Sequence, residues 1–260
     1  MPRPQFSRRT LLLGTAAWSA APVLATAADD ADQRYAVLSI VGDKITLVGF
    51  RFATGSRIDQ NVHRVIPISA ALLDNRALLA VDDAVKRVKP SATTTLLASR
   101  DPALFALQDR PLDQPGDAAE SVGAIKTLLQ QSKATRLILV APLRSEARFR
   151  LGDGWIGSGQ LTGLGFYVDG ATRIKLIDSG ASGTGYLAPY AYLSVSLVDV
   201  DTMATIRRSI ITESTLIPTS ASKEAALPWD ALSNDQKMEL LQSLISRGIA
   251  RGVRELFAGV

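Results

Sequence analysis

The sequence predicts an α+β fold in which a mixed, twisted sheet carries two or three packed helices. Apolar residues recur at helical spacing over residues 74–88, 118–132 and 233–257. Between these segments lie β-rich runs, and the run at 135–141 is apolar throughout, as expected for a strand covered on both faces. Helices and strands mixed in this order are typical of the α+β class.

The first strands are predicted at residues 35–40 and 45–52. Both runs are rich in aliphatic and aromatic residues, and Gly42 and Asp43 between them are turn formers. We therefore expect an amino-terminal β-hairpin. Pro90 cannot continue the helix predicted before it, and the chain then returns to β-rich sequence at 93–98.

The second half of the chain predicts a long β-hairpin and a carboxy-terminal amphipathic helix. Residues 191–200 and 204–212 form two β-rich runs around a short polar turn. Residues 218–228, bounded by two prolines, read as a linker. Ser233 and Gln236 have the spacing of a capping box, which predicts that the last helix begins here and runs through residue 257.

Residues 1–27 have the pattern of a twin-arginine export signal. A basic segment with paired arginines precedes leucines, a moderately apolar run and an A-x-A cleavage pattern. An ordinary secretory signal with two chance arginines is the alternative. We expect cleavage, a single α+β domain over 28–260, and a soluble periplasmic protein that meets the Tat translocase during export. The residues that carry this prediction are Ser7, Arg8, Arg9, Leu11, Ala25 and Ala27.

Composition excludes several kinds of site. Removal of 27 residues with three arginines would leave 26 basic and 25 acidic residues, so nucleic-acid binding has no electrostatic support. The chain has no cysteine, which excludes disulfides, thiolate metal sites and a lipid anchor on cysteine. His63 is the only histidine, so one chain cannot offer two imidazoles. We predict no cofactor, no metal site and no transmembrane segment after cleavage.

One phrase of sequence resembles a family. Residues 196–202, Ser-Leu-Val-Asp-Val-Asp-Thr, follow the apolar strand at 137–140 and look like a β-hairpin of the curli-secretion lipoprotein superfamily and of related Tol-system amino-terminal domains. The resemblance implies an envelope α+β domain that binds or assembles. The lipid-bearing cysteine of that family is missing here, and the resemblance transfers no functional residue.

The most unusual segment is rich in glycine and aromatic residues, over 152–190. Glycines permit close backbone approach, and aromatic side chains give large contact areas at low entropic cost. We interpret the segment as an insertion that forms a binding hairpin or a lid over a cleft; irregular sheet connections with their own small cluster are the alternative. The aromatic candidates are Trp155, Phe166, Tyr167, Tyr186 and Tyr190.

Basic residues precede this segment. Arg144, Arg148 and Arg150 could bind an anionic ligand, although the solvated face of a strand would look the same. The Gly-x-Gly pairs do not complete a phosphate-binding motif. Ser220 and Lys223 have Ser-x-x-Lys spacing without the partner motifs of penicillin-recognising enzymes.

Three functions remain open. The first is a non-enzymatic binding or envelope-accessory protein that uses residues 152–190 to hold a small ligand or an envelope protein. The second is a cofactor-free hydrolase, in which His63 acts as general base with Asp59 and a nearby serine. The third is an assembly module that pairs through the edge of the hairpin at 191–212.

Overall fold

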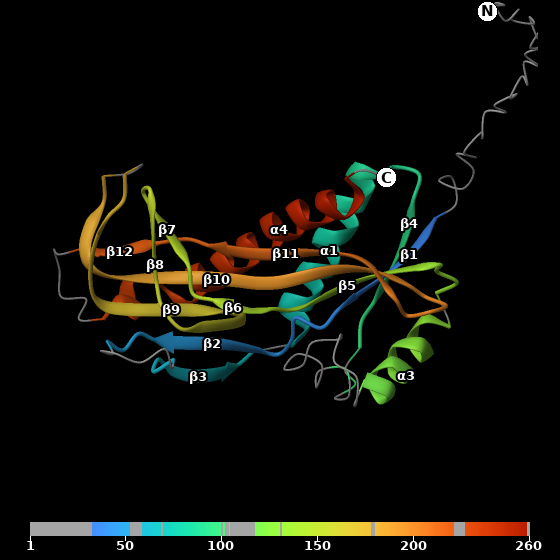
Figure 1. The fold of residues 1–260 in the computed structure, drawn as a ribbon, viewed down its shortest axis with the longest axis horizontal. Coiled ribbons are helices and arrows are strands. Elements are labelled where there is room, and N and C mark those ends of the chain that lie inside the picture. The colour runs from blue at the N-terminus through green and yellow to red at the C-terminus, as the bar shows by residue number, and fades with distance from the viewer. Residues whose placement is uncertain are drawn as a thin grey trace, which may run out of the picture.

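The computed structural model shows an α+β fold with one large twisted sheet (Figure 1). It describes residues 33–52, 59–68, 70–99, 101, 104, 118–130, 132–177, 180–220 and 227–258. The predicted fold class is therefore confirmed. The predicted export signal at 1–27 lies outside the described residues, and the signal remains a prediction.

The main sheet has ten strands in the order β3-β2-β9-β10-β5-β1-β4, with β11 and β12 also paired to β10 and β6 paired to β9. Strands β7 and β8 form a separate hairpin. The sheet is mixed, because β1 runs parallel to β4 and β5 whereas β10 is antiparallel to its neighbours. The strands are β1 (Arg34–Ser39), β2 (Lys44–Gly49), β3 (Val62–Pro67), β4 (Thr93–Leu97), β5 (Arg136–Pro142), β6 (Arg144–Glu146), β7 (Phe149–Leu151), β8 (Gly154–Ile156), β9 (Gln160–Lys175), β10 (Ser182–Asp199), β11 (Thr205–Ser214) and β12 (Ile217–Ser220).

The described helices are α1 (Ala70–Val88), α3 (Ala118–Leu129), α4 (Asn234–Phe257) and the 3₁₀ helix η2 (Pro228–Ala231). All three predicted helices are confirmed, with ends shifted by a few residues. The capping box at the start of α4 is also confirmed: the Gln236 amide donates to Ser233 Oγ, and the Ser233 amide donates to the Gln236 side chain. These two bonds satisfy amide groups that the first helical turn would otherwise leave unpaired.

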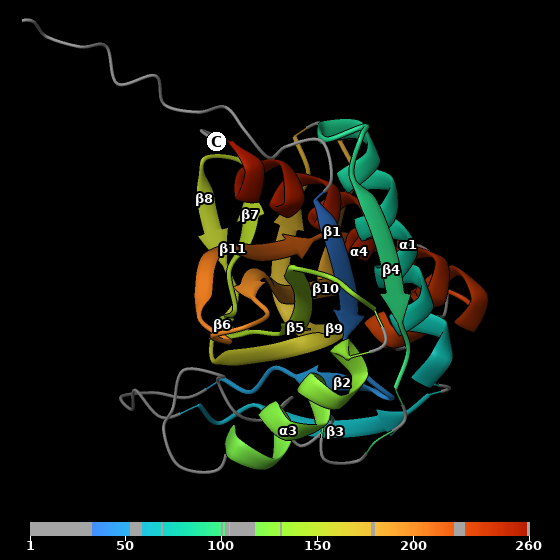
Figure 2. The same ribbon diagram turned by 90° about the vertical axis from the view of Figure 1, so that its right-hand side faces the viewer.

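The sheet is covered on both faces. Helices α1 and α4 pack on one face, where they share the main core with side chains of β1, β5, β9 and β10. On the other face α3 covers β1 and β5, and the β7–β8 hairpin covers a tyrosine-rich cluster on β9 and β10. Figure 2 shows α1 on the right of the molecule and the β7–β8 hairpin on the left. No helix of the described part of the chain is long and apolar enough to cross a membrane.

Helix α4 approaches β11 closely through two glycines. A Cβ atom at Gly248 would lie 2.5 Å from Ile211 Cγ2, and one at Gly252 would lie 3.1 Å from Ile211 Cδ1. Polar bonds border this contact: Glu213, which is buried, accepts from Arg247 Nε at 2.8 Å and pairs with Arg251 Nη1 at 2.6 Å. The small residues let helix and strand approach, and the ion pairs satisfy the carboxylate at the edge of the contact.

Two sequence expectations about connectivity are corrected. Strands β1 and β2 do not form a hairpin: β1 lies between β4 and β5, whereas β2 pairs with β3 and β9. The turn that follows β1 therefore carries the chain to a different part of the sheet. The predicted linker at 218–228 contributes the end of β12 and the start of η2, and its residues 221–226 lie outside the described part.

The segment 152–190 does not form irregular sheet connections, and it is part of the main sheet rather than an insertion: β9 and the first half of β10 pair as a long antiparallel hairpin. It provides β8, β9 and the first half of β10, and the last two are the longest strands of the sheet. Gly165 within it serves close packing: a Cβ at this position would overlap the carbonyl oxygen of Thr46 on β2 and approach the Tyr190 hydroxyl. Glycine inside a strand at such a close approach is a packing device and not a turn signal.

Candidate functional site

An open groove of about 1100 Å³ lies where β2 ends and β3 begins, and residues of β6 and β8 also line it. Four segments that are distant in sequence contribute to it: the residues after β2, those before β3, the strand β6 and the turn from β8 to β9. The lining residues are Phe50, Arg51, Phe52, Asp59, Gln60, Asn61, Arg144, Glu146, Ala147, Arg148, Trp155, Ile156, Gly157, Ser158, Gly159 and Gln160.

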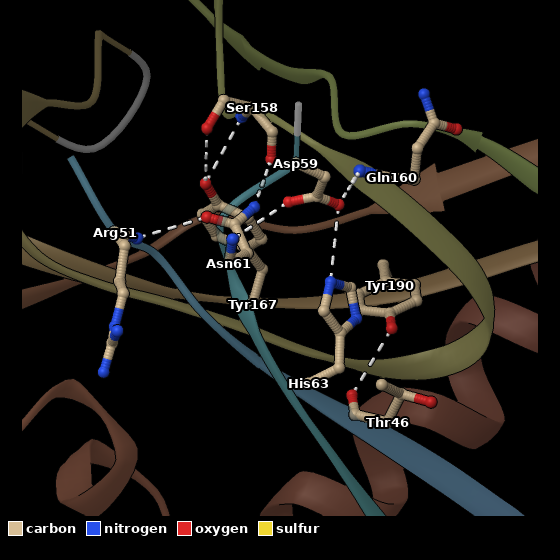
Figure 3. A network of polar contacts seen from close by, with 9 residues as sticks. All are labelled: Thr46, Arg51, Asp59, Asn61, His63, Ser158, Gln160, Tyr167 and Tyr190. Atoms are coloured by element: carbon tan, nitrogen blue, oxygen red, sulfur yellow. Dashed lines mark hydrogen bonds and ion pairs between the residues drawn. The ribbon is translucent and has the colours of Figure 1, made fainter. Parts of the chain in front are cut away.

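Two side chains before β3 bind these segments together, and we call them the clasp: Asp59 and Asn61. The Asn61 side chain accepts from the Arg51 amide at 3.1 Å and donates to the Ser158 carbonyl at 2.7 Å. The Asp59 carboxylate accepts from the amides of Gln160 at 2.7 Å and Asn61 at 3.0 Å. Figure 3 shows the clasp between the β2 and β9 sides of the groove.

The clasp requires glycine at position 159. This residue has a φ of +83°, and a Cβ atom here would overlap the Asn61 amide and the Asp59 carboxylate. The clasp also sets the charge of Asp59. Burial of this carboxyl acts to raise its pKa, but the hydrogen bonds from the two backbone amides, aided by His63, outweigh burial and lower the pKa. Asp59 is therefore ionised at neutral pH.

Buried tyrosines support the groove from below. The Ser158 amide donates to Tyr167 Oη at 3.2 Å, and the Arg148 amide donates to Tyr192 Oη at 3.2 Å. Burial raises the pKa of both phenols, so they stay neutral at physiological pH. The backbone of both groove walls is thus tied to side chains of the central sheet, which favours a preformed binding surface.

Two large aromatic side chains are exposed at the groove. Phe52 is 80% exposed and Trp155 is 63% exposed, although aromatic residues of this size usually contribute to the core. Phe52 follows β2, and Trp155 lies on β8 of the covering hairpin. The groove therefore offers two separate apolar faces among charged and amide side chains.

The aromatic residues predicted as one site lie in two different environments. Trp155 lines the groove, and its binding role stays a prediction. In contrast, Phe166, Tyr167, Tyr186 and Tyr190 are at most 1% exposed, so the expectation that they form an open contact surface is corrected. They lie on β9 and β10, where alternate side chains enter the cores on the two faces of the sheet.

Only some of the arginines predicted to bind an anionic ligand line the groove. Arg148 lines the groove and pairs with Glu146 at 2.9 Å. Arg150 lies opposite Trp155 on the β7–β8 hairpin but does not line the groove. Sequence reasoning missed Arg51, Phe52 and Asn61 as site residues. Arg51 and Phe52 belong to the run predicted as a strand at 45–52, and nothing in the sequence shows that this run or Asn61 meets the β8–β9 turn.

His63 lies on the edge strand β3, beside the groove but not in its lining. Its Nε2 atom is 3.4 Å from Asp59 Oδ2, so the predicted proximity of these two residues is present (Figure 3). Among the described residues, no serine or threonine hydroxyl is hydrogen-bonded to His63. No group of three potential metal-ligating side chains occurs in the described part of the chain either.

Comparison with known proteins leaves the family open. No family model matches the chain, and no curated protein matches it. Solved structures with a similar course of the chain include a PelC dodecamer from Paraburkholderia phytofirmans, at 10% identity and a TM-score of 0.30, with 85% of this chain and 86% of that chain covered. A protein described as a neuraminyllactose-binding hemagglutinin homolog from Helicobacter pylori has 11% identity and a TM-score of 0.36, with 87% of each chain covered. A Xanthomonas campestris protein has 9% identity and a TM-score of 0.31, with 89% of this chain and 85% of that chain covered.

Proposed function

We propose that this chain is an exported, non-enzymatic binding protein whose ligand lies in the groove between β2, β6 and β8. The observation that carries the proposal is the exposure of Trp155 and Phe52 at a groove whose walls are fixed by the clasp. Concave sites that combine apolar surfaces with a few oriented polar groups are typical of ligand binding. Exposed aromatic side chains of this size are characteristic anchors of such sites.

The arrangement favours binding over hydrolysis. His63 Nε2 lies 3.4 Å from Asp59 Oδ2, but the Asp59 carboxylate already accepts from two backbone amides of the clasp. A general base also needs a nucleophile within hydrogen-bond reach, and none of the described serine or threonine hydroxyls is hydrogen-bonded to His63. We therefore assign Asp59 a structural role in shaping the groove.

The proposal can be tested with the two tryptophans that would remain after removal of the predicted signal. Trp155 lines the groove, whereas Trp229 packs edge-to-face on Phe166 and lies under the Lys237 ammonium group, at 4.1 Å from ring centroid to nitrogen. The indole N–H resonances of ¹⁵N-labelled mature protein can be recorded during addition of the low-molecular-mass fraction of a periplasmic extract. We expect the Trp155 resonance to shift and the Trp229 resonance to stay in place.

Two results would contradict the proposal. One is a shift of Trp229 alone, which would place the ligand on the helical face of the sheet. The other is turnover in a broad esterase and phosphatase screen that His63→Ala abolishes and Trp155→Ala leaves intact. That result would favour the hydrolase hypothesis over the binding protein.

A further inference from the structure

Some charged side chains of the groove have partners among the residues that the structure describes, and others do not. Arg148 is neutralised by Glu146, with which it makes contacts of 2.9 and 3.0 Å. The Asp59 carboxylate is satisfied by the clasp and by His63. For the guanidinium groups of Arg51 and Arg144, the structure shows no hydrogen bond or ion pair with any described residue. Two cations in the lining are therefore available to a ligand.

The shape of the groove indicates the size of that ligand. Its volume of about 1100 Å³ is close to the upper limit of the range of about 300–1000 Å³ typical of small-molecule pockets. Trp155 and Phe52 come from different walls, so a ligand that meets both must span the groove. A chain of several rings fulfils this requirement better than a single small metabolite.

The lining also restricts the chemical class. A bound peptide helix would require a continuous apolar surface, but the exposed apolar groups here are two separate rings among arginine, asparagine and glutamine side chains. Sugar rings have an apolar C–H face that stacks on aromatic side chains and a rim of hydroxyl groups that hydrogen-bond to polar ones. Carboxylate groups on such rings would match the planar, two-pronged donor geometry of guanidinium groups.

We infer that the groove binds an acidic oligosaccharide, with sugar rings stacked on Trp155 and Phe52 and carboxylates held by Arg51 and Arg144. This inference rests on the proposed function and specifies its ligand. It commits the anion to carboxylates on a sugar chain. Inorganic phosphate offers the same charge without the rings, and it therefore serves as a competitor in the test.

The test is a calorimetric titration of the mature protein with three acidic tetrasaccharides, built from galacturonate, mannuronate or the hyaluronan repeat. Neutral maltotetraose and sodium phosphate are the reference ligands. We expect at least one acidic tetramer to bind at least tenfold more tightly than maltotetraose, and to bind more weakly as ionic strength rises. Arg51→Gln and Arg144→Gln should each weaken that binding by about tenfold, the size expected for loss of a charge-assisted contact.

Arg87→Gln is the matched control, because it removes the same charge from an exposed position on α1, on the opposite face of the sheet from the β7–β8 hairpin. It should bind the acidic tetramer as the unchanged protein does. Unfolding midpoints of all three variants show whether any loss reflects misfolding, and Arg51→Lys or Arg144→Lys can replace a variant that does not fold.

The possible failures are distinguishable from one another. The inference is overturned if none of the acidic tetramers exceeds maltotetraose in affinity, if phosphate displaces them completely at equal concentration, or if both arginine variants bind like Arg87→Gln. In each of these cases a ligand-induced shift of the Trp155 indole by the periplasmic fraction would still support the proposed function. If an acidic tetramer binds and neither Trp155→Ala nor Phe52→Ala changes its affinity, the groove is not the site and both proposals fail.

Discussion

The contact between α4 and β11 permits a quantitative prediction: glycine-to-alanine substitution should destabilise the fold at this contact and stabilise it at a free helical position. Glycine in a helix interior costs about 1 kcal/mol relative to alanine, so Gly→Ala at a free helical position should stabilise the fold by about that amount. At Gly248 the new Cβ would lie 2.5 Å from Ile211 Cγ2 and 3.0 Å from Glu213 Cγ. Ile211 is fully buried, so its displacement would disturb the packing around it.

Overpacking of a buried contact costs about 1–3 kcal/mol. The separation at Gly248 is far below ordinary contact, so we take the upper end of this range. After the gain in helix propensity, Gly248→Ala should lower the free energy of unfolding by about 2 kcal/mol. For a chain of this size that corresponds to a melting temperature lower by roughly 4–8 °C.

Gly123 in α3 is the matched control, because a Cβ atom there would meet no heavy atom within 4 Å. Gly123→Ala should therefore raise the free energy of unfolding by about 1 kcal/mol. Urea unfolding of the mature protein, followed by far-ultraviolet circular dichroism, measures both variants. The reasoning is refuted if Gly248→Ala is as stable as the unchanged protein, or if the two substitutions change stability in the same direction.

Three further predictions concern buried or bonded polar groups. Because the pKa of Asp59 is lowered in the fold, the contribution of its carboxylate to stability is complete above about pH 5 and declines as the pH falls below about 4. Urea unfolding midpoints measured across this range should depend less on pH in Asp59→Asn than in the unchanged protein. Burial raises the pKa of Asp74, whose carboxylate accepts from the Val41 and Gly42 amides, so the ionised form is disfavoured in the fold. Asp74→Asn should equal or exceed the unchanged protein in melting temperature at pH 7, and this difference should vanish as the pH falls through the raised pKa. Asp74→Ala should have a lower melting temperature than the unchanged protein both at pH 7 and below that pKa. A lower melting temperature of the asparagine variant at pH 7 would contradict this account. The Tyr186 hydroxyl is buried without a hydrogen-bond partner among the described residues, so Tyr186→Phe should raise the free energy of unfolding by about 1 kcal/mol. Tyr167→Phe, which loses the hydrogen bond from the Ser158 amide, should lower the free energy of unfolding by about 1 kcal/mol. Chemical denaturation measures both variants, and a loss of stability in both would contradict the prediction.

The sequence pattern correctly predicted the elements that are formed by interactions between residues close together in the chain. The helix at 234–257 was evident from its apolar stripe and its capping box, and the β10–β11 hairpin from two β-rich runs around a short turn. These features depend on residues a few positions apart. The order of strands in the sheet does not, which is why the expected pairing of β1 with β2 was wrong.

The glycine-aromatic segment shows why pattern alone misled. Gly165 permits β2 to approach β9, and Gly183 permits β12 to approach β10, since a Cβ at either position would overlap a carbonyl oxygen of the neighbouring strand. A sequence reveals the glycine but not the strand that needs the space. The same limit applies to Tyr167 and Tyr190, whose neighbours on the sheet determine that they are core residues.

The candidate site was only partly predictable for the same reason. Trp155, Arg148 and Asp59 were identified as individual residues, and all three line the groove. Their convergence with Arg51 and Phe52 depends on the parallel pairing of β2 with β9, two strands that are more than a hundred residues apart in the chain. No periodicity or local motif encodes such a pairing, so the groove could be found only from the fold.

The most direct test of the central claim is native mass spectrometry of the mature protein purified from the periplasm, compared with the double variant Trp155→Ala/Phe52→Ala. The binding-protein account predicts additional mass on the unchanged protein that is lost on denaturation and absent from the folded double variant. The denatured mass also reports whether cleavage follows residue 27. A ligand retained equally by both proteins would contradict the account, because the two exposed aromatic side chains would then have no part in holding it.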